Sequence, residues 1–179
     1  MHKNLKSVLI DEESIIKRSK ELGQEITNKY KGDIEPPIFI ALLKGSVPFL
    51  SELIKYIDLD IEIDFMDVSS YGGGTESTRD IRILKDLDRS IKGKKIIIVE
   101  DIVDTGRTLV AVTKILENKG AAEIKVVSLL DKPDRREVEV DVEFVGFEIP
   151  NEFVVGFGLD YNEKYRNLPY VGVLKDDMY

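Results

Sequence analysis

Residues Lys95–Gly120 read KIIIVEDIVDTGRTLVAVTKILENKG and decide the fold class. The apolar run Lys95–Val99 predicts a strand that is buried on both faces, as the strands of parallel sheets are. A polar loop follows over residues 100–106. Apolar residues at helical spacing then predict a helix over residues 107–119, with Gly120 as its stop. Strand, turn and helix in this order indicate a βαβ unit and hence a parallel sheet.

The same alternation continues on both sides of this stretch. An amphipathic helix is predicted over residues 11–31, with Asp11 as its N-cap and Gly32 as its stop, and a second helix over residues 46–57. Further strands are predicted over residues 38–43, 61–68, 81–84 and 124–130, and short strands of a small flap over about 143–148, 153–157 and 170–174. We therefore expect an α/β fold of one domain, residues 1–179: a twisted, mainly parallel sheet flanked by helices, with a small hood or flap from the terminal segments.

The composition excludes several kinds of chemistry. The chain has no cysteine and a single histidine, His2, so disulfides, thiolate zinc sites and a histidine triad are not expected. The net charge of −8 disfavours broad binding to nucleic acid, which needs a basic surface. No apolar run approaches the roughly 20 residues of a membrane span, and the N-terminus lacks the apolar core of a signal peptide. The sequence therefore predicts a cytoplasmic enzyme with neither a nucleic-acid nor a membrane partner.

The chemistry is concentrated in VEDIVDTGRTL, Val99–Leu109. Its second half suits a phosphate, because Gly106 allows a tight turn while a helix N-terminus and two threonine hydroxyls supply donors. Glu100 and Asp101 would repel a phosphate by themselves, but they suit ribose hydroxyls or a hydrated Mg²⁺. The turn alone leaves a plainer alternative open, in which Asp104 is only the N-cap of the following helix.

This eleven-residue string resembles the phosphoribosyl-pyrophosphate signature of the type I phosphoribosyltransferases: an acidic pair, two apolar residues, then Asp-Thr-Gly and a threonine. Other segments extend the resemblance, over nearly the whole chain, to the bacterial hypoxanthine–guanine phosphoribosyltransferases. They are LKGS (Leu43–Ser46), SSYG (Ser69–Gly72), LLDKP (Leu129–Pro133), FVVGFGLDYNEKYRNLP (Phe153–Pro169) and VGVLK (Val171–Lys175).

The resemblance implies the type I phosphoribosyltransferase fold and a role in purine salvage. The expected reaction transfers the 5-phosphoribosyl group from phosphoribosyl pyrophosphate to hypoxanthine or guanine, which gives IMP or GMP and pyrophosphate, with Mg²⁺ as cofactor. Members of the family are dimers or tetramers, so a homodimer or homotetramer is expected.

The resemblance also implies roles for residues around the ribose and its phosphates. Glu100 and Asp101 match the pair that holds the ribose hydroxyls and Mg²⁺, and Asp104 matches the general acid or base for the purine. The 5′-phosphate loop comprises Asp104, Thr105, Gly106, Arg107 and Thr108, although the position of Arg107 varies in the family. Lys44, Gly45 and Arg166 match the pyrophosphate-binding residues, and the Lys44–Gly45 loop matches one with a non-proline cis peptide. Ser46 stands where the family often has a second glycine.

The purine-binding residues are implied in the same way. Lys132 matches the donor to the six-position oxygen, which favours oxopurines because the amino group of adenine would face an unpaired donor. Phe153 matches the aromatic that stacks on the base, Val154 offers backbone groups to its edge, and Asp160 matches a second metal ligand. Ser70 and Tyr71 match a lid that excludes water. Without the resemblance, plainer interpretations would be preferred. Lys132 would be a surface lysine, Phe153 and Val154 would be strand core, and Arg166 would be a solvated charge. Ser70 and Tyr71 would belong to a surface loop.

Two alternatives remain open beside this one. A regulator with the same fold would sense phosphoribosyl pyrophosphate and bind nucleic acid, but it would need a basic face or an added DNA-binding module. Within the enzyme class, relatives prefer xanthine or adenine. Lys132 argues against adenine, whereas nothing in the sequence separates hypoxanthine from guanine as the preferred base.

Overall fold

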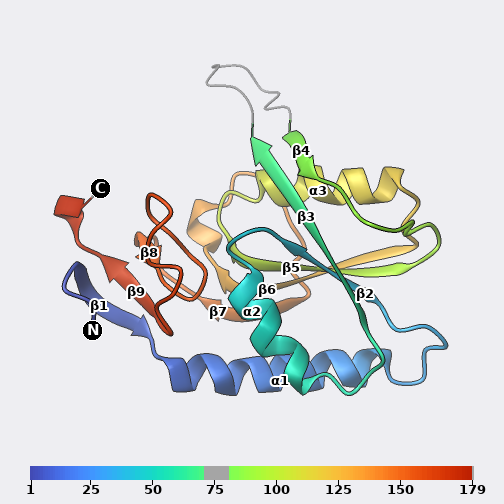
Figure 1. Ribbon diagram of the computed structural model, residues 1–179, viewed down its shortest axis with the longest axis horizontal. Helices are drawn as coiled ribbons and strands as arrows, with labels where there is room; N and C mark the ends of the chain where they lie inside the picture. The colour runs from blue at the N-terminus through green and yellow to red at the C-terminus, as the bar shows by residue number, and fades with distance from the viewer. Residues whose placement is uncertain (71–80, 179) are drawn as a thin grey trace.

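The structure is a computed structural model that describes residues 1–70 and 81–178. A main sheet has the strand order β4-β3-β2-β5-β6-β7, and a smaller sheet has the order β1-β9-β8 (Figure 1). The strands are β1 (Leu5–Ile10), β2 (Ile38–Leu42), β3 (Glu62–Ser70), β4 (Ile81–Lys85), β5 (Lys95–Val103), β6 (Glu123–Asp131), β7 (Phe144–Glu148), β8 (Val154–Val155) and β9 (Val171–Leu174). The α-helices are α1 (Glu12–Tyr30), α2 (Val47–Leu53) and α3 (Arg107–Asn118), and short 3-10 turns cover Ile54–Tyr56, Pro133–Arg135 and Asp176–Met178.

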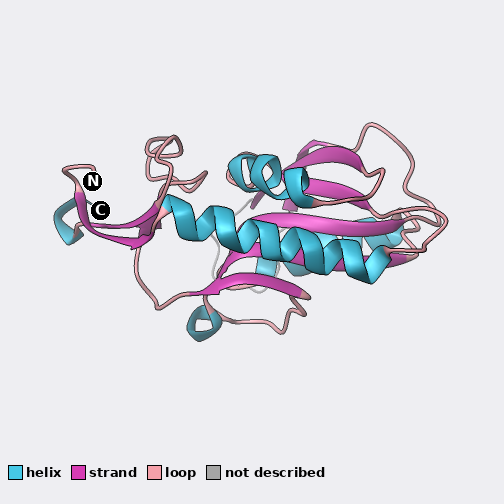
Figure 2. Ribbon diagram, turned by 90° about the horizontal axis from the view of Figure 1, so that it is seen from below, coloured by secondary structure: helices cyan, strands magenta, loops and turns pink. Residues whose placement is uncertain are grey.

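The main sheet is parallel except for β4, which pairs antiparallel with β3. Its central strands are buried on both faces, and alternate residues face opposite ways. In β2, Phe39 and Ala41 join the core beneath α1 and α2, whereas Ile40 joins the core beneath α3. The sheet therefore lies between two helical layers, as Figures 1 and 2 show, and the predicted α/β class is confirmed.

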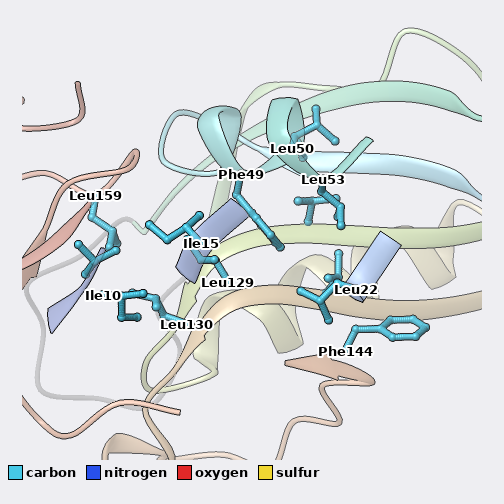
Figure 3. Close-up of a cluster of buried hydrophobic side chains, with 14 of the residues drawn as sticks. Ile10, Ile15, Leu22, Phe49, Leu50, Leu53, Leu129, Leu130, Phe144 and Leu159 are labelled. Carbon is cyan, nitrogen blue, oxygen red and sulfur yellow. The ribbon is translucent and has the colours of Figure 1, made fainter. Parts of the chain in front are cut away.

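The helix α1 runs along one face of the main sheet and covers the larger of the two buried clusters, the one that it shares with α2 (Figure 2). Asp11 caps this helix as predicted, because its Oδ1 accepts a hydrogen bond from the Ser14 backbone at 2.8 Å. Ile10 and Ile15 lie on either side of the cap and belong to the same buried cluster (Figure 3). The N-terminal end of α1 is thus fixed both by its cap and by apolar packing.

Two predictions about the elements are wrong, and so is the plainer alternative for Asp104. The central strand does not end at Val99: β5 continues to Val103, because β6 extends beside it to Asp131 and pairs with these polar residues. The strand at 143–148 belongs to the main sheet, since β7 pairs parallel with β6, rather than to the flap. Asp104 is not the N-cap of α3; that position belongs to Gly106, whose φ of +82° is left-handed.

The hood is the small sheet, and it is built from both ends of the chain as predicted. It also contains β1, a strand that the sequence pattern did not indicate, which pairs antiparallel with β9. Leu5, Val155 and Leu174 form its own small buried cluster. Both chain ends lie in this part of the molecule (Figure 1). None of the helices in the described ranges is long and apolar enough to cross a membrane.

Candidate active site

The carboxyl ends of β2, β5 and β6 meet at one edge of the main sheet, where ligands of parallel sheets bind. Three connections follow these ends: the turn at residues 43–46, the turn at residues 104–106, and the segment that begins at Lys132. The Lys132 backbone N–H donates to the Val103 carbonyl at 2.9 Å, which ties the second connection to the third. Most of the predicted site residues are therefore brought to this edge.

The turn after β5 encloses a first cavity of about 180 Å³. It is lined by Glu100, Asp101, Ile102, Val103, Asp104, Thr105, Gly106, Thr108 and Leu109. The turn is held from outside, since the Thr105 carbonyl accepts hydrogen bonds from the backbones of Glu137 and Val138. A side chain at Gly106 would also collide with Val140, its Cβ lying 2.7 Å from Cγ2. The first cavity therefore combines a helix N-terminus and two threonines with three carboxylates, a set that suits a phosphorylated sugar.

Arg107 is the one residue of this turn that does not line the first cavity. Its Nε instead forms an ion pair with the Glu137 carboxylate. The Arg107 side chain is therefore held by Glu137, and its part in phosphate binding stays a prediction.

Two of the carboxylates that line the first cavity, Glu100 and Asp101, are buried. Burial, reinforced by the neighbouring Asp101 charge, raises the pKa of Glu100 well above its usual range. Burial also raises the pKa of Asp101 to about 6, although backbone donors and the Arg166 charge act against this rise. No lysine or arginine of the described chain forms a direct ion pair with either group. Two poorly compensated carboxylates of this kind are a place for hydroxyl donors or a cation.

The turn after β2 packs directly on Asp101. A Cβ on Gly45 would lie 1.7 Å from the Asp101 Oδ2 atom, so only glycine fits there. Ser46 is fully buried, and its hydroxyl donates to the Leu42 carbonyl at 2.5 Å, which closes the turn. The cis peptide expected at Lys44–Gly45 is one bond earlier, at Leu43–Lys44.

A second cavity, of about 450 Å³, adjoins the first, and Asp104 and Ile102 line both. Its other lining residues are Lys132, Arg135, Asn151, Glu152, Phe153, Val154 and Leu159. Phe153 is 36% exposed and meets Tyr161 edge to face at 5.6 Å between ring centroids. Val154 is buried in β8 of the hood. The predicted purine residues Lys132, Phe153 and Val154 thus share one hollow of a size that suits a planar heterocycle.

Lys132 is nearly buried, at 8% exposure, and its ammonium donates to the Glu152 carbonyl at 2.7 Å. Burial lowers the pKa of this lysine, and the positive charge of Arg135 acts in the same direction, while Asp104 acts against both. The ammonium has further donors beyond this bond, and Lys132 lines the second cavity.

Sequence reasoning did not select Arg135, whose Nε pairs with Asp104 Oδ1 at 3.2 Å. It lies three residues after Lys132, in the segment whose first part carries the family resemblance. The sequence does offer one indication of a functional role, because Arg135 is a basic residue on the turn after a predicted strand. Its spacing from other residues could not show that Asp104 is its partner.

The segment over residues 156–168 folds back over the turn after β2. A Cβ on Gly158 would lie 1.9 Å from the Gly45 carbonyl oxygen, so the two backbones are in direct contact. Arg166 donates to the Gly158 carbonyl at 2.7 Å and pairs with Asp160 at 2.9 Å. Lys44 pairs with Glu163 at 3.0 Å. The predicted pyrophosphate residues Lys44, Gly45 and Arg166 are therefore brought together, although they are far apart in sequence.

The three predicted metal ligands do not converge in the same way. In the described ranges, no group of three or more histidine or acidic side chains is close enough to hold a metal ion. Glu100 and Asp101 are successive residues of a strand, whose side chains diverge, and Asp160 is held by Arg166.

Tyr71, one of the two predicted lid residues, lies in residues 71–80, outside the part of the chain that the structure describes. Ser70 is the last residue of β3, paired with Ile81 of β4, and its backbone alone is described.

Comparison with known proteins agrees with the geometry of the strand-end site. The family model described as "Phosphoribosyl transferase domain" matches residues 8–162, which include both cavities. The chain therefore belongs to the phosphoribosyltransferase family.

Within that family, the similarity is to one particular kind of enzyme. The hypoxanthine-guanine phosphoribosyltransferase of Lactococcus lactis subsp. lactis is 55% identical over 179 residues, which are 100% of this chain and 96% of the relative. A crystal structure of a hypoxanthine phosphoribosyltransferase from Staphylococcus aureus has a TM-score of 0.94 at 51% identity, and the match covers 100% of this chain and 96% of that one. The hypoxanthine phosphoribosyltransferase of Trypanosoma cruzi, solved with its product IMP, has a TM-score of 0.93 at 36% identity over 100% and 99% of the two chains.

Proposed function

We propose that residues 1–179 act as a single phosphoribosyltransferase domain that transfers the 5-phosphoribosyl group of phosphoribosyl pyrophosphate to hypoxanthine or guanine. The products are IMP or GMP and pyrophosphate. The identity of 51–55% to full-length hypoxanthine-guanine phosphoribosyltransferases supports this assignment. The observation that carries it is the position of Asp104, which lines both the cavity beside the helix N-terminus and the cavity beneath Lys132.

The two cavities suit the two halves of a nucleoside monophosphate. The first would take the phosphate at Thr105–Thr108 and the ribose hydroxyls at Glu100 and Asp101. The second would take the purine, with Phe153 against its face and the Lys132 ammonium donating to its six-position oxygen. Adenine carries an amino group at that position, and two facing donors leave both unpaired, which disfavours adenine strongly.

The reaction breaks the bond between the anomeric carbon and pyrophosphate and forms a bond from that carbon to the purine nitrogen. The purine loses a proton in the exchange. Asp104 lies on the wall between the two cavities, where the new bond forms, so we assign this proton to its carboxylate. Lys44 and Arg166 neutralise the charge that accumulates on the departing pyrophosphate.

Glu100 and Asp101 also fit a bound Mg²⁺, because they are buried carboxylates with no direct cationic partner in the described chain. Mg²⁺ takes one or two protein carboxylates together with substrate oxygens and water, so a set of three protein ligands at one point is not required. When bound, the ion would supply positive charge to the phosphates of the substrate. Asp160, held beside Arg166, is the third proposed ligand.

The test is a steady-state comparison of four purines with phosphoribosyl pyrophosphate and Mg²⁺, in which pyrophosphate release is measured. Hypoxanthine or guanine should support rapid release, xanthine should be a poor substrate, and adenine should be almost inactive. Release with adenine as the best acceptor, or with none of the four, would contradict the proposed function. The lid role of Ser70 and Tyr71, the cytoplasmic location and the homodimer or homotetramer stay predictions.

A further inference from the structure

Glu163 contacts both cations of the proposed pyrophosphate site and has no assigned role in the reaction. We propose that its carboxylate is a built-in competitor of pyrophosphate: it holds Lys44 and Arg166 together in the free protein and is displaced from them when pyrophosphate binds. This inference rests on the proposed function, because it takes Lys44 and Arg166 as pyrophosphate-binding residues.

The contacts of Glu163 show how one side chain can occupy two cationic groups. Its Oε2 atom lies 3.0 Å from the Lys44 Nζ, and its Oε1 atom lies 3.4 Å from the Arg166 Nη2. Lys44 belongs to the turn after β2, whereas Arg166 follows the hood strand β8 along the chain. The Glu163 carboxylate therefore bridges two distant parts of the chain with an anion, as a bound pyrophosphate would.

The backbone of Glu163 is fixed, whereas its side chain is largely exposed. Its N–H donates to the Asp160 Oδ2 at 2.9 Å, and its φ of +61° is an uncommon conformation for a residue with a side chain. The side chains of Glu163 and Lys44 are 66% and 64% exposed. The carboxylate can therefore leave its partners for water at little cost, while the position from which it returns stays constant.

Arg166 keeps its place when Glu163 leaves. Its Nη1 donates to the Gly158 carbonyl at 2.7 Å, and its Nη2 lies 2.9 Å from the Asp160 carboxylate. The two pairs with Glu163 are exposed, so the competition is modest in strength. It weakens the binding of pyrophosphate without blocking it, which helps the product to leave.

The experiment is a calorimetric titration of inorganic pyrophosphate with Mg²⁺, with and without saturating IMP, into the wild-type protein and Glu163→Gln. Gln keeps the size and hydrogen bonding of the side chain but removes its charge. The Kd for pyrophosphate should fall about 2- to 5-fold, the range that exposed ion pairs supply. A Kd that is unchanged or higher in Glu163→Gln would overturn the proposal.

Two controls separate competition from a general effect of charge. Glu62→Gln removes another exposed ion pair, with Arg89 at 3.1 Å. Glu62 is the first residue of β3, at the amino ends of the strands and away from the proposed site, so the Kd should stay unchanged. In a Lys44→Gln background, the effect of Glu163→Gln should shrink to less than half, because one of its two partners is gone. An equal fall in both backgrounds would indicate a long-range field and would overturn the competition. Failure of the proposed function itself would be visible separately, since the wild type would then neither bind pyrophosphate nor release it from phosphoribosyl pyrophosphate.

Discussion

At the scale of the residue, Asp104 is the point where the two cavities join. Arg135 holds one of its oxygens at 3.2 Å, which orients the carboxylate without burying it. The helix α3 takes its N-cap from Gly106, so Asp104 is not needed for capping and is available to the substrate.

Replacing Asp104 by Asn tests the proton role. Asn keeps the size of the side chain but cannot take up a proton, so turnover should fall by about 10²–10⁴-fold. The KM for phosphoribosyl pyrophosphate should change little, because the phosphate donors of the turn remain. Steady-state kinetics measures both quantities, with Asp88→Asn at the other end of the sheet as a control that should behave as wild type. Turnover that survives in Asp104→Asn would remove this residue from proton transfer.

The buried Asp101 predicts a pH dependence of stability in the metal-free protein. Its pKa rises from the ordinary 3.8 to about 6 on folding, so the native state binds more protons than the unfolded state between these values. The free energy of unfolding therefore loses up to about 3 kcal/mol from this group as the pH rises from about 4 to about 6.

The measurement is urea unfolding with EDTA at several pH values, for the wild type and for Asp101→Asn. Other carboxylates titrate in the same window, so the difference between the two proteins is the relevant quantity. Asp101→Asn should gain stability relative to the wild type as the pH rises through this window. Parallel curves would mean that Asp101 is not poorly solvated in the folded protein.

Some residue-level features were within reach of the sequence and others were not. The threonines and Gly106 of the turn could be predicted, because a helix N-terminus after a strand imposes local requirements on its residues. The Arg135 contact with Asp104 and the Glu163 contact with Lys44 could not be predicted, because they join segments whose relative position depends on the whole fold. Glu163 lies in a segment that resembles the family and Arg135 lies two residues beyond another, but the contacts themselves follow only from the coordinates.

At the scale of the element, the strands that were best predicted are those whose burial is complete. All five residues of β2 are buried, and an unbroken apolar run in the sequence predicts such a strand. The sequence predicts the end of β5 too early, at Val99, because the polar residues Glu100 and Asp101 resemble a loop. In the structure, β5 continues through them and pairs with β6. The partner of β7 was also beyond prediction, since periodicity does not say which strand a short segment joins. β1 was not predicted as a strand, because its residues do not alternate regularly between buried and exposed.

The turn after β2 gives a prediction of its own. Gly45→Ala would place a Cβ 1.7 Å from the Asp101 Oδ2, so the carboxylate or the turn must move. The KM for phosphoribosyl pyrophosphate should rise about tenfold or more, since a displacement of this size disrupts the positioning of a substrate. Gly32→Asn is the control, because that glycine has no neighbour within 4 Å of an added Cβ. Asn tolerates positive φ, so this variant should keep the wild-type KM. A wild-type KM in Gly45→Ala would show that the contact with Asp101 has no part in substrate binding.

At the scale of the whole molecule, the second cavity is lined by both the main sheet and the hood. Ile102 lies in β5 and Lys132 directly follows β6, whereas Val154 is the first residue of the hood strand β8. One side of the hood packs in a small cluster of its own around Leu5, Val155 and Leu174. Other residues of the same strands join the larger core of the main sheet: Ile10, Val154, Val171 and Val173. Purine binding should therefore depend on the packing of the hood.

Leu5→Ala tests this dependence. Leu5 is 2% exposed, so its truncation should lower the free energy of unfolding by about 2–5 kcal/mol and loosen the hood. The KM for hypoxanthine should rise, because β8 loses part of its support. Leu22→Ala removes a fully buried leucine from the core beneath α1, and it should cost similar stability without a change in KM. Denaturant unfolding and steady-state kinetics on both variants give the comparison, and equal KM values would count against a role of the hood.

The direct contact between Gly158 and the Gly45 carbonyl has a consequence for the newly made chain. During synthesis the turn after β2 leaves the ribosome long before Arg166 does, because translation runs from the N-terminus. In a nascent chain, the strand-end edge therefore has the residues proposed to bind the ribose and its phosphate, but it lacks Phe153, Asp160 and Arg166. β9, which pairs with β1 at the very start of the chain, is made later still. A partly made protein thus cannot complete its pyrophosphate or purine pockets, and the full site closes only when the C-terminal segment has joined the first strand.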